Sequence, residues 1–360
     1  MEKSKVIIVA IICLAAAGAA LVWAQNRSGG AENENAGAGK SEIAPDGAPA
    51  VENQLLAEKA QNKPVKLLAF GDLLLDRYIK LYIDRNSPEY PFADIKDALA
   101  GNDLVLANLE GSFTDFAPRQ LDPNNTSFTF DPKLAATLKS SGFNLVSLAN
   151  NHVQDFGKDG FAQSQAYLDG AGIEHFGDFY NEGPALAKDI NGLKIAFIGY
   201  NEFGKPSIEP TIAKIKEAAL RADYIVVYAH WGAEYQTDPW PGSQEKGRRF
   251  IDAGADAVLG SHPHVVQPIE IYKGKPIFYS LGNFVFDQIF SDQVRHGLGV
   301  RLILGKDKAE CELFSTEMKN FQVSLSSEKK KGEVLSWLAK NSVASESVKT
   351  QIKAGKFIVR

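Results

Sequence analysis

The stretch Tyr224-Ile225-Val226-Val227-Tyr228-Ala229-His230 is an almost unbroken apolar run that ends on an imidazole. A second run, Ala257-Val258-Leu259, leads in the same way into Gly260-Ser261-His262-Pro263-His264. Short, fully apolar runs are typical of strands that are buried on both faces of an α/β sheet. Such sheets bind ligands beyond the carboxyl ends of their strands. The three histidines therefore stand where a site is expected.

Three earlier apolar runs also end on polar side chains. Val65–Phe70 is followed by Gly71-Asp72, Leu104–Leu109 ends on Asn108-Leu109 and is followed by Glu110, and Asn144–Ala149 is followed by Asn150-Asn151-His152. Five strand ends would thus bring carboxylate, amide and imidazole groups to one edge, which predicts a metal site built from the C-termini of strands.

Helical segments alternate with these runs, which predicts an α/β fold with a largely buried sheet. Expected strands lie at 65–70, 104–109, 144–149, 194–200, 224–229 and 257–259, and expected helices at 91–100, 132–141, 160–170, 211–222 and 244–254. After Pro263 the helical crossovers disappear. Strands expected at 265–272, 276–286, 297–304, 310–318 and 321–326 should therefore be mostly antiparallel.

Each polar residue taken alone has an ordinary structural interpretation. An Asp after Gly is usually a cap or turn residue, and Asn150 and Asn151 would most often form a turn. The group is more informative, because four of the chain's 6 histidines fall at strand ends. In His262-Pro263-His264, a continued extended strand would point both imidazoles to one face.

The ordered blocks that carry these residues resemble the CapA family, which is named for the biosynthesis of capsular poly-γ-glutamate. The blocks are Gly71-Asp72 with Arg77, Asn108-Leu109-Glu110, Ala149-Asn150-Asn151-His152 with Asp155 and Gly157, His230-Trp231-Gly232 with Glu234-Tyr235, Gly260-Ser261-His262-Pro263-His264, and Ser280-Leu281-Gly282-Asn283-Phe284. The resemblance covers residues 65 to 290. The family is a branch of the calcineurin-like metallophosphoesterases.

The resemblance implies a four-layer α/β/β/α sandwich of two mixed sheets, metallophosphatase-like, with the site at one edge. It also implies the metal ligands Asp72, Glu110, Asn151, His230, His262 and His264. His152 would assist the leaving group, so it and Asp72 are the expected catalytic residues.

One position departs from the superfamily pattern, which usually reads Asp-x-His in the first block. Leu74 stands here two residues after Asp72. The cation held by Asp72, Glu110 and His264 would therefore lack a ligand, whereas the site of Glu110, Asn151, His230 and His262 would be complete. We expect one firm divalent metal (Mn, Zn or Fe) and a conditional second one.

Candidates for substrate binding are Arg77, Glu234, Tyr235 and Asn283, with Asp76 and Gln288 beside them. Arg77 suits an anionic substrate, because a guanidinium forks onto a carboxylate or a phosphate. A salt bridge from Arg77 to Asp76 or Glu234 is the alternative.

The N-terminal residues 1–24 predict a transmembrane anchor, since Val6–Ala24 is apolar and follows Lys3 and Lys5. Nineteen residues of helix would span about 28 Å, close to the hydrocarbon core of a bilayer. A cleaved signal peptide ending at Ala24 is the alternative. Both place the rest of the chain outside the cytoplasm, and we expect a single-pass protein of the cell membrane.

The amino-acid composition divides residues 25–360 into three parts. Residues 25–63 are poor in large apolar side chains and predict a disordered tether. A single CapA-like domain is expected at 64–326 and a helical tail at 327–360. Cys13 and Cys311 are the two cysteines, so no disulfide framework is expected, and the net charge of −5 argues against nucleic acid as a partner.

Two classes of function fit this sequence. The first is a membrane-anchored metal-dependent hydrolase or transferase that acts on an anionic polymer such as poly-γ-glutamate, or on its attachment. The second is a non-catalytic accessory subunit of a membrane complex that synthesises or exports the polymer. A general metallophosphoesterase acting on a phosphoester is a further alternative.

Overall fold

The computed structural model describes residues 63–116, 124–205 and 207–359. The expected anchor, and the expected tether apart from Lys63, lie outside these residues. Within the described ranges, no helix combines the length and the apolar character that a bilayer crossing requires.

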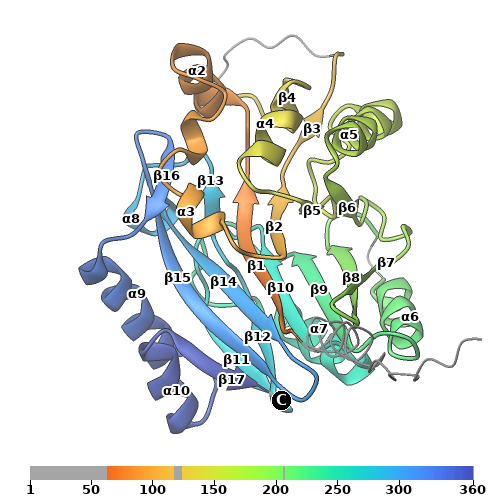
Figure 1. The fold of residues 1–360 in the computed structure, drawn as a ribbon, viewed down its shortest axis with the longest axis vertical. Coiled ribbons are helices and arrows are strands. Elements are labelled where there is room, and N and C mark those ends of the chain that lie inside the picture. Colours follow the sequence, from red (N-terminus) through yellow and green to blue (C-terminus); the bar gives the residue numbers. More distant parts are fainter. Residues whose placement is uncertain (1–62, 117–123, 206, 360) are drawn as a thin grey trace, which may run out of the picture. The chain divides into compact units, whose positions relative to one another are not determined.

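Two mixed sheets form the centre of this part of the chain (Figure 1). The nine-stranded sheet runs in the order β16-β15-β14-β1-β2-β5-β6, with β13 beside β1 and β17 beside β15. Its strands are β1 (Val65–Leu73), β2 (Leu104–Leu109), β5 (Leu145–Ser147), β6 (Glu174–Phe176), β13 (Asn283–Val285), β14 (His296–Leu304), β15 (Ala309–Lys319), β16 (Gln322–Leu325) and β17 (Lys356–Val359).

The six-stranded sheet runs in the order β11-β12-β10-β9-β8-β7. Its strands are β7 (Leu186–Ile190), β8 (Leu193–Asn201), β9 (Tyr224–His230), β10 (Ala257–Ser261), β11 (Ile269–Tyr272) and β12 (Lys275–Phe278). A small separate ladder joins β3 (Ser112–Phe113) to β4 (Thr129–Phe130).

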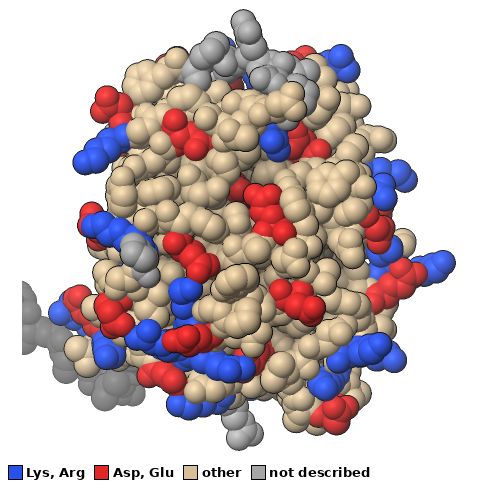
Figure 2. Space-filling view, turned by 180° about the vertical axis from the view of Figure 1, so that it is seen from behind, with Lys and Arg blue, Asp and Glu red and all other residues tan. Residues whose placement is uncertain are grey.

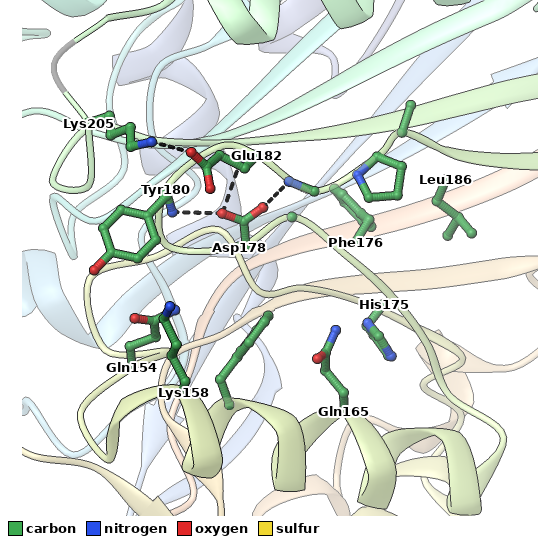
Figure 3. Close-up of a pocket in the computed structure, with 15 residues that line it drawn as sticks. Gln154, Lys158, Gln165, His175, Phe176, Asp178, Tyr180, Glu182, Leu186 and Lys205 are labelled. Atoms are coloured by element: carbon green, nitrogen blue, oxygen red, sulfur yellow. Dashed lines mark hydrogen bonds and ion pairs between the residues drawn. The ribbon is translucent and has the colours of Figure 1, made fainter. Parts of the chain in front are cut away.

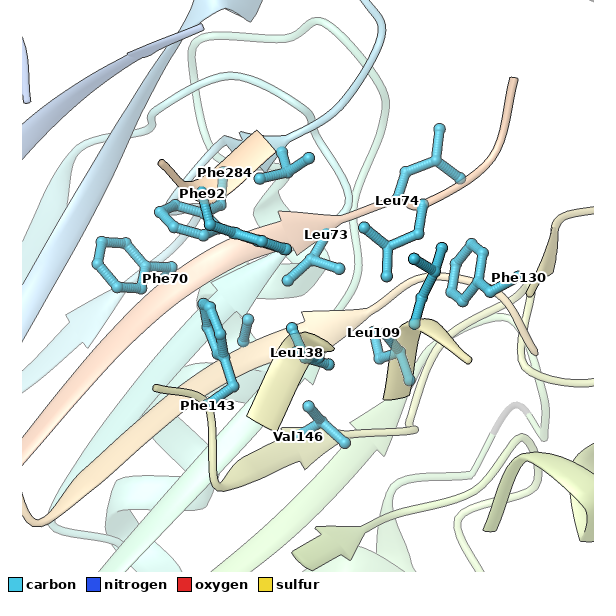
Figure 4. Close-up of a cluster of buried hydrophobic side chains, with 14 of the residues drawn as sticks. Phe70, Leu73, Leu74, Phe92, Leu109, Phe130, Leu138, Phe143, Val146 and Phe284 are labelled. Atoms are coloured by element: carbon cyan, nitrogen blue, oxygen red, sulfur yellow. The ribbon is translucent and has the colours of Figure 1, made fainter. Parts of the chain in front are cut away.

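Alternating side chains along the strands create three apolar layers. On β1, Leu68 and Phe70 point into a core shared with the helices on the outer face of the nine-stranded sheet, part of which Figure 4 shows. Leu67 and Ala69 face the other way, into the core between the two sheets. On the far side of the six-stranded sheet, Val227 and its neighbours pack against the remaining helices. The resulting order is helices, sheet, sheet, helices.

The helices cover the outer faces of the two sheets and one edge. On the nine-stranded sheet they are α2 (Arg77–Arg85), the 3₁₀ turn Tyr90–Phe92, α3 (Lys96–Leu99), α4 (Leu134–Ser140) and α5 (Gly157–Ala171). On the six-stranded sheet they are α6 (Glu209–Ala218) and α7 (Pro241–Ala253). The short α8 (Asp292–Arg295) precedes β14, and α9 (Glu328–Asn341) with α10 (Glu346–Lys353) closes the edge near β15.

The strands after Pro263 are mostly antiparallel, as expected, although β12 pairs with β10 and β13 with β1 in parallel. The expected strand at 265–272 starts only at Ile269. The C-terminal segment was expected to be helical but also contains β17, which pairs antiparallel with β15 because Phe357 and Val359 complete the core between the sheets. Helix α2 was not predicted.

Candidate metal centre at the strand ends

The carboxyl ends of β1, β2, β9 and β10 meet at one edge of the two sheets. β1 and β2 run parallel in one sheet, with Asp72 opposite Asn108. β9 and β10 run parallel in the other, with His230 opposite Ser261. Parallel strands present their carboxyl ends on the same side, so polar residues that follow each apolar run gather at one place.

Asp72 and Glu110 are the two buried carboxylates of this site, with 0% and 1% of their surface exposed. The amide of Asn108 holds them together, since its Nδ2 donates to Asp72 Oδ1 at 2.8 Å and to Glu110 Oε2 at 3.3 Å. Asn108 was not among the predicted site residues. Only its position in the block Asn108-Leu109-Glu110 could have indicated this role.

His230 crosses from the other sheet to join these groups. Its Nε2 lies 2.6 Å from Asn151 Oδ1, and its Nδ1 lies 3.0 Å from Ser261 Oγ. The same Nδ1 is 3.9 Å from Asp72 Oδ1. Asn151 is therefore part of the site, and Ser261 orients the ring.

His262 and His264 enter the site by a turn and not by a continued strand. β10 ends at Ser261, and both histidines have positive φ, 94° and 58°. The expectation that an extended strand aligns the two imidazoles is thus wrong. The turn still brings their ring centroids to 6.0 Å, and the strained backbone, costing about 1–3 kcal/mol per residue, is typical of functional sites.

His264 lies among three polar partners. Its Nδ1 is 2.8 Å from Asn283 Oδ1 and 3.3 Å from Asp72 Oδ2, while its Nε2 is 3.8 Å from Glu110 Oε1. Asn283 was expected to bind substrate, but in this structure its side chain contacts a candidate metal ligand.

Burial and mutual charge decide the protonation of the site. Burial raises the pKa of Glu110 well above its usual value, and the adjacent Asp72 raises it further. Burial also acts to raise the pKa of Asp72, but His264, His230 and Asn108 outweigh it and hold that pKa below its usual value. Burial, with the charge of neighbouring histidines, lowers the pKa of His230 and brings that of His262 to about 3. The two imidazoles are therefore neutral and able to act as ligands at neutral pH.

These residues fit a divalent cation. Within the described ranges, the ion-pair partners of Asp72 and Glu110 are all histidines. Two buried carboxylates without a strong cation are costly. Moreover, the buried Nδ1 of His262 finds no hydrogen-bond partner among the described residues. Carboxylate, amide oxygen and imidazole are together a usual ligand set for Zn²⁺, Mn²⁺ or Fe²⁺.

His152 stands at the rim of the site. Its Nδ1 lies 3.0 Å from Asp155 Oδ2 and its Nε2 lies 3.9 Å from Glu110 Oε1. The ring of Phe128 packs on the imidazole with a centroid distance of 4.1 Å, and the backbone N–H of Phe128 donates to the same Asp155 oxygen at 2.7 Å. Asp155 thus fixes the ring so that Nε2 faces the site.

Arg77 packs over the ring of Phe128, with its guanidinium carbon 4.7 Å from the ring centroid. Its ion-pair partner is Asp287, whereas the expected salt-bridge partners were Asp76 and Glu234. Asp76 caps α2 by accepting from the backbone N–H of Arg77, and its other carboxylate oxygen accepts from the N–H of Thr129.

Glu234 and Tyr235 follow β9 on an exposed segment beside the two turn histidines. The Glu234 carboxylate, His262 and His264 can each offer one ligand atom within 4.8 Å of the others. The Tyr235 ring centroid is 6.1 Å from that of His264, and the Tyr235 hydroxyl accepts from Gln288 Nε2 at 2.8 Å.

Elsewhere on the described surface, no comparable group of buried carboxylate, amide and imidazole side chains comes together. A hollow of about 610 Å³ lies between α5 and the loop at 177–186 (Figure 3). Its Lys205 pairs with Glu182, and Asp178 is occupied by backbone N–H groups that include that of Tyr180. Figure 2 shows acidic and basic side chains intermingled on one face of the molecule, without a broad basic track.

Comparison with known proteins identifies the family. Residues 66–288 match the family model described as bacterial capsule synthesis protein PGA_cap. The chain therefore belongs to this family, and the resemblance to CapA proteins is confirmed.

Curated relatives include two Bacillus proteins. The chain is 33% identical to the capsule biosynthesis protein CapA of Bacillus anthracis over 255 residues, which cover 63% of this chain and 61% of that protein. It is 32% identical to the PGA biosynthesis protein CapA of Bacillus subtilis over 236 residues, 61% and 62% of the two chains. The match thus spans about three fifths of either relative.

More distant similarities also exist. A probable polyglutamine synthesis accessory protein of Mycobacterium tuberculosis is 28% identical over 256 residues, which cover 62% of this chain and 66% of that protein. Among solved structures, TT1561 of Thermus thermophilus superposes with a TM-score of 0.40 at 12% identity, covering 69% of this chain and 98% of that one.

Proposed function

We propose that this member of the bacterial capsule synthesis protein PGA_cap family carries out metal-assisted hydrolysis or transfer on an anionic polymer such as poly-γ-glutamate, or on the bond that attaches it. The observation that carries the proposal is the convergence of Asp72, Glu110, Asn151, His230, His262 and His264 at one buried edge. The names of the CapA relatives support the substrate class.

These six residues would hold the divalent metal, at one firm position and a conditional second one. When bound, the cation supplies Lewis acidity and lowers the pKa of a water molecule. Asn108 keeps the two carboxylates in place through its hydrogen bonds, and Ser261 orients His230. A set of ligands that is oriented in advance loses less entropy when the cation and the substrate bind.

His152 would donate a proton to the leaving group from Nε2. Asp155 accepts from Nδ1, which orients the imidazole so that Nε2 faces the site. Phe128 covers one face of the ring and excludes water from that side. Such a general acid contributes about 10²–10⁴-fold to a rate.

Arg77 would bind a carboxylate or phosphate of the substrate. Its Nε is buried without a hydrogen-bond partner among the described residues, and the residue has a positive φ of 51°. An incoming anion could share the guanidinium with Asp287, since a guanidinium presents five donors. Tyr235, with 42% of its surface exposed, and Glu234 would line the entrance.

A non-catalytic accessory role is the second candidate. It is favoured by Leu74, which is fully buried in the outer core and supplies no ligand at the end of β1 (Figure 4). In that case, variants that lose the cation would still support assembly of the polymer in cells, whereas the enzymatic proposal requires them to fail.

The test of the enzymatic proposal uses the whole 360-residue chain, stripped of metal and reloaded with Mn²⁺, Zn²⁺ or Fe²⁺. Turnover of model phosphodiesters and of γ-glutamyl peptides would be measured for the parent, for His230→Ala and for the control His175→Ala. His175 pairs with Asp169 away from the site. We expect metal-dependent turnover that only His230→Ala abolishes. Absence of turnover with every metal, or full activity in His230→Ala, would refute the proposal, and the substrate preference separates a polymer-directed enzyme from a general metallophosphoesterase.

We also propose that the chain is held at the cell membrane by residues 1–24, with the site outside the cytoplasm. The support is the apolar run Val6–Ala24 behind Lys3 and Lys5. Carbonate extraction of membranes and protease treatment of intact cells would test it. Release by carbonate, or protection from protease, would contradict it.

A further inference from the structure

We propose that Glu234 is a metal ligand that forms, with His262 and His264, a second cation position beside Asp72, Glu110 and His230. Glu234 was expected to bind substrate, and the second cation was expected to have an incomplete set of ligands. This inference rests on the proposed metal centre, and it replaces the assumed shortage of ligands with a specific residue.

The three donors already have nearly the spacing that one ion requires. Their ligand atoms lie within 4.8 Å of one another, as do those of the separate group Asp72, Glu110 and His230. Metal–ligand bonds of about 2.0–2.2 Å place ligand atoms about 3–4.4 Å apart, depending on the angle between them. A small movement of the exposed Glu234 side chain is enough to close the difference. Two imidazoles and one carboxylate form a set that binds Zn²⁺ or Fe²⁺ with positions left open.

The backbone holds Glu234 next to the two histidines. The N–H of Tyr235, the next residue, donates to the carbonyl of Pro263 at 2.8 Å. Pro263 stands between His262 and His264, so this bond ties the segment after β9 to the histidine turn. Tyr235, His262 and His264 all have positive φ. Both sides of this contact therefore keep an unfavourable backbone conformation that the surrounding fold enforces.

The hydrogen bonds of His264 leave its Nε2 free for a cation. Asn283 Nδ2 donates to the carbonyl of Val294 at 3.1 Å, which orients the amide so that Oδ1 faces His264. The Nδ1 of His264, 2.8 Å from that oxygen, therefore carries the proton. The lone pair lies on Nε2, which faces the site. Asn283 thus acts as a positioning residue for His264.

His262 provides the second, independent sign of a ligand. The residue is only 6% exposed, and its buried Nδ1 has no hydrogen-bond partner among the described residues. The rings of Phe203 and His230 flank it at centroid distances of 4.3 and 4.7 Å. A buried polar atom without a partner is unfavourable, and a cation beside the ring would satisfy it.

No donor from β1 competes for this position. Leu74 belongs to the outer core, and its backbone N–H donates to Val285. β1 therefore supplies Asp72 alone, and the segment after β9 provides the additional carboxylate.

The test compares cation binding in Glu234→Gln with the parent and with Glu245→Gln, which alters an exposed glutamate on α7. Metal per chain would be measured by elemental analysis, and affinity by competition with a chromogenic chelator for Zn²⁺. Co²⁺ absorption would report the coordination number. We expect Glu234→Gln to lose one cation per chain, or to bind it at least tenfold more weakly, with a changed Co²⁺ spectrum. Glu245→Gln should match the parent, and circular dichroism of the metal-free proteins should be identical.

Unchanged stoichiometry, affinity and Co²⁺ spectrum in Glu234→Gln would overturn the inference. The result is independent of turnover. If Glu234→Gln loses a cation while the parent shows no hydrolysis, the ligand assignment stands and the enzymatic proposal fails. If the parent hydrolyses substrate and Glu234→Gln binds metal normally, the enzymatic proposal stands and the assignment of Glu234 as a ligand fails.

Discussion

His230 Nε2 lies 2.6 Å from Asn151 Oδ1, although 79 positions separate the two residues in the sequence. His230 ends β9 of the six-stranded sheet, and Asn151 follows β5 of the nine-stranded sheet. This contact joins the two sheets at the site, so the ligand set exists only where both sheets are assembled.

Removal of either side chain should therefore lower the affinity for the cation that the two residues would share. For His230→Ala we expect a loss of at least about 100-fold in affinity, since even residues that merely orient ligands contribute about 10–100-fold. Zn²⁺ titration against a chelator would measure the change. His296→Ala is a suitable control, because His296 is a buried histidine bonded to the Asp292 carbonyl elsewhere. Equal affinity in His230→Ala and the control would contradict the assignment.

Asn108→Leu tests whether the amide between the two carboxylates orients them. Without its donors at 2.8 and 3.3 Å, Asp72 and Glu110 lose a buried partner. We expect cation affinity to fall about 10–100-fold and the metal-free protein to lose about 1–3 kcal/mol of unfolding free energy. Chemical denaturation and metal titration would be run in parallel. A metal-free protein as stable as the parent, with unaltered affinity, would show that Asn108 has no such role.

Asp155→Asn should reveal whether His152 protonates the leaving group. The carboxylate 3.0 Å from Nδ1 holds the imidazole with Nε2 toward the site, so its loss should lower kcat with little effect on KM. The decrease should be about 10²-fold for a poor alkoxide leaving group and small for p-nitrophenolate, because only the former needs a proton. The measurement is the ratio of kcat in the parent to kcat in Asp155→Asn, determined for each of the two substrates. An equal decrease for both would indicate a structural role instead.

Gly71→Ala should disrupt the end of β1. A Cβ atom at this position would lie 1.8 Å from the carbonyl oxygen of Gly282, a backbone atom that cannot move aside by a rotamer change. We expect a loss of about 3 kcal/mol or more in unfolding free energy, since overpacking a rigid interior typically costs about 1–3 kcal/mol.

The matched control for this glycine is Gly170→Ala on α5, where nothing lies within 4 Å of the added Cβ. That change should stabilise the protein by about 0.5–1 kcal/mol, because alanine favours a helix. Urea unfolding of both variants gives the comparison. Equal stability of Gly71→Ala and the parent would mean that the β1–Gly282 contact is not tight in solution.

Glu312→Gln should produce a pH-dependent loss of stability. Glu312 lies opposite Arg301 in the β14–β15 ladder, at 2.8 Å from its guanidinium. Partial burial tends to raise the pKa of Glu312, but Arg301 outweighs this and holds it below its usual value of 4.5. A depressed pKa in the folded state stabilises the protein above the unfolded pKa and loses that effect as the pH falls through the folded one.

The substitution should therefore cost about 0.5–1 kcal/mol at pH 7, a size suited to a partly exposed pair. The cost should shrink steadily as the pH is lowered below about 4.5, the unfolded value. Urea unfolding of parent and variant across this range would check it. A difference that is constant with pH would show that the charge of Glu312 contributes nothing.

The sequence indicated the candidate site because several apolar strands end on polar residues, and four of the chain's 6 histidines are among them. Asp72, Glu110, Asn151 and His230 follow runs whose burial is certain from hydrophobicity, and parallel strands must end at a common edge. The α/β class followed from the same alternation. Helix α2 was missed because its 9 residues are too few for a helical period to stand out, although Ile79 and Ile83 form a buried face.

Contacts between segments that are distant in the sequence could not be predicted from local patterns. The pairing of Arg77 with Asp287 and that of β17 with β15 depend on which surfaces meet after the layers have packed. Likewise, the positive φ of His262 and His264 is imposed by the surrounding fold, since this backbone conformation is uncommon for any residue other than glycine.

Hydrophobic periodicity thus determined where the ligands stand along the chain, because burial of a strand is a property of its own residues. Which of these candidate ligands would share a cation depends on the tertiary structure. Glu234 reaches the histidine turn through a backbone bond between Tyr235 and Pro263, and the free energy of that contact exists only when both sheets are in place.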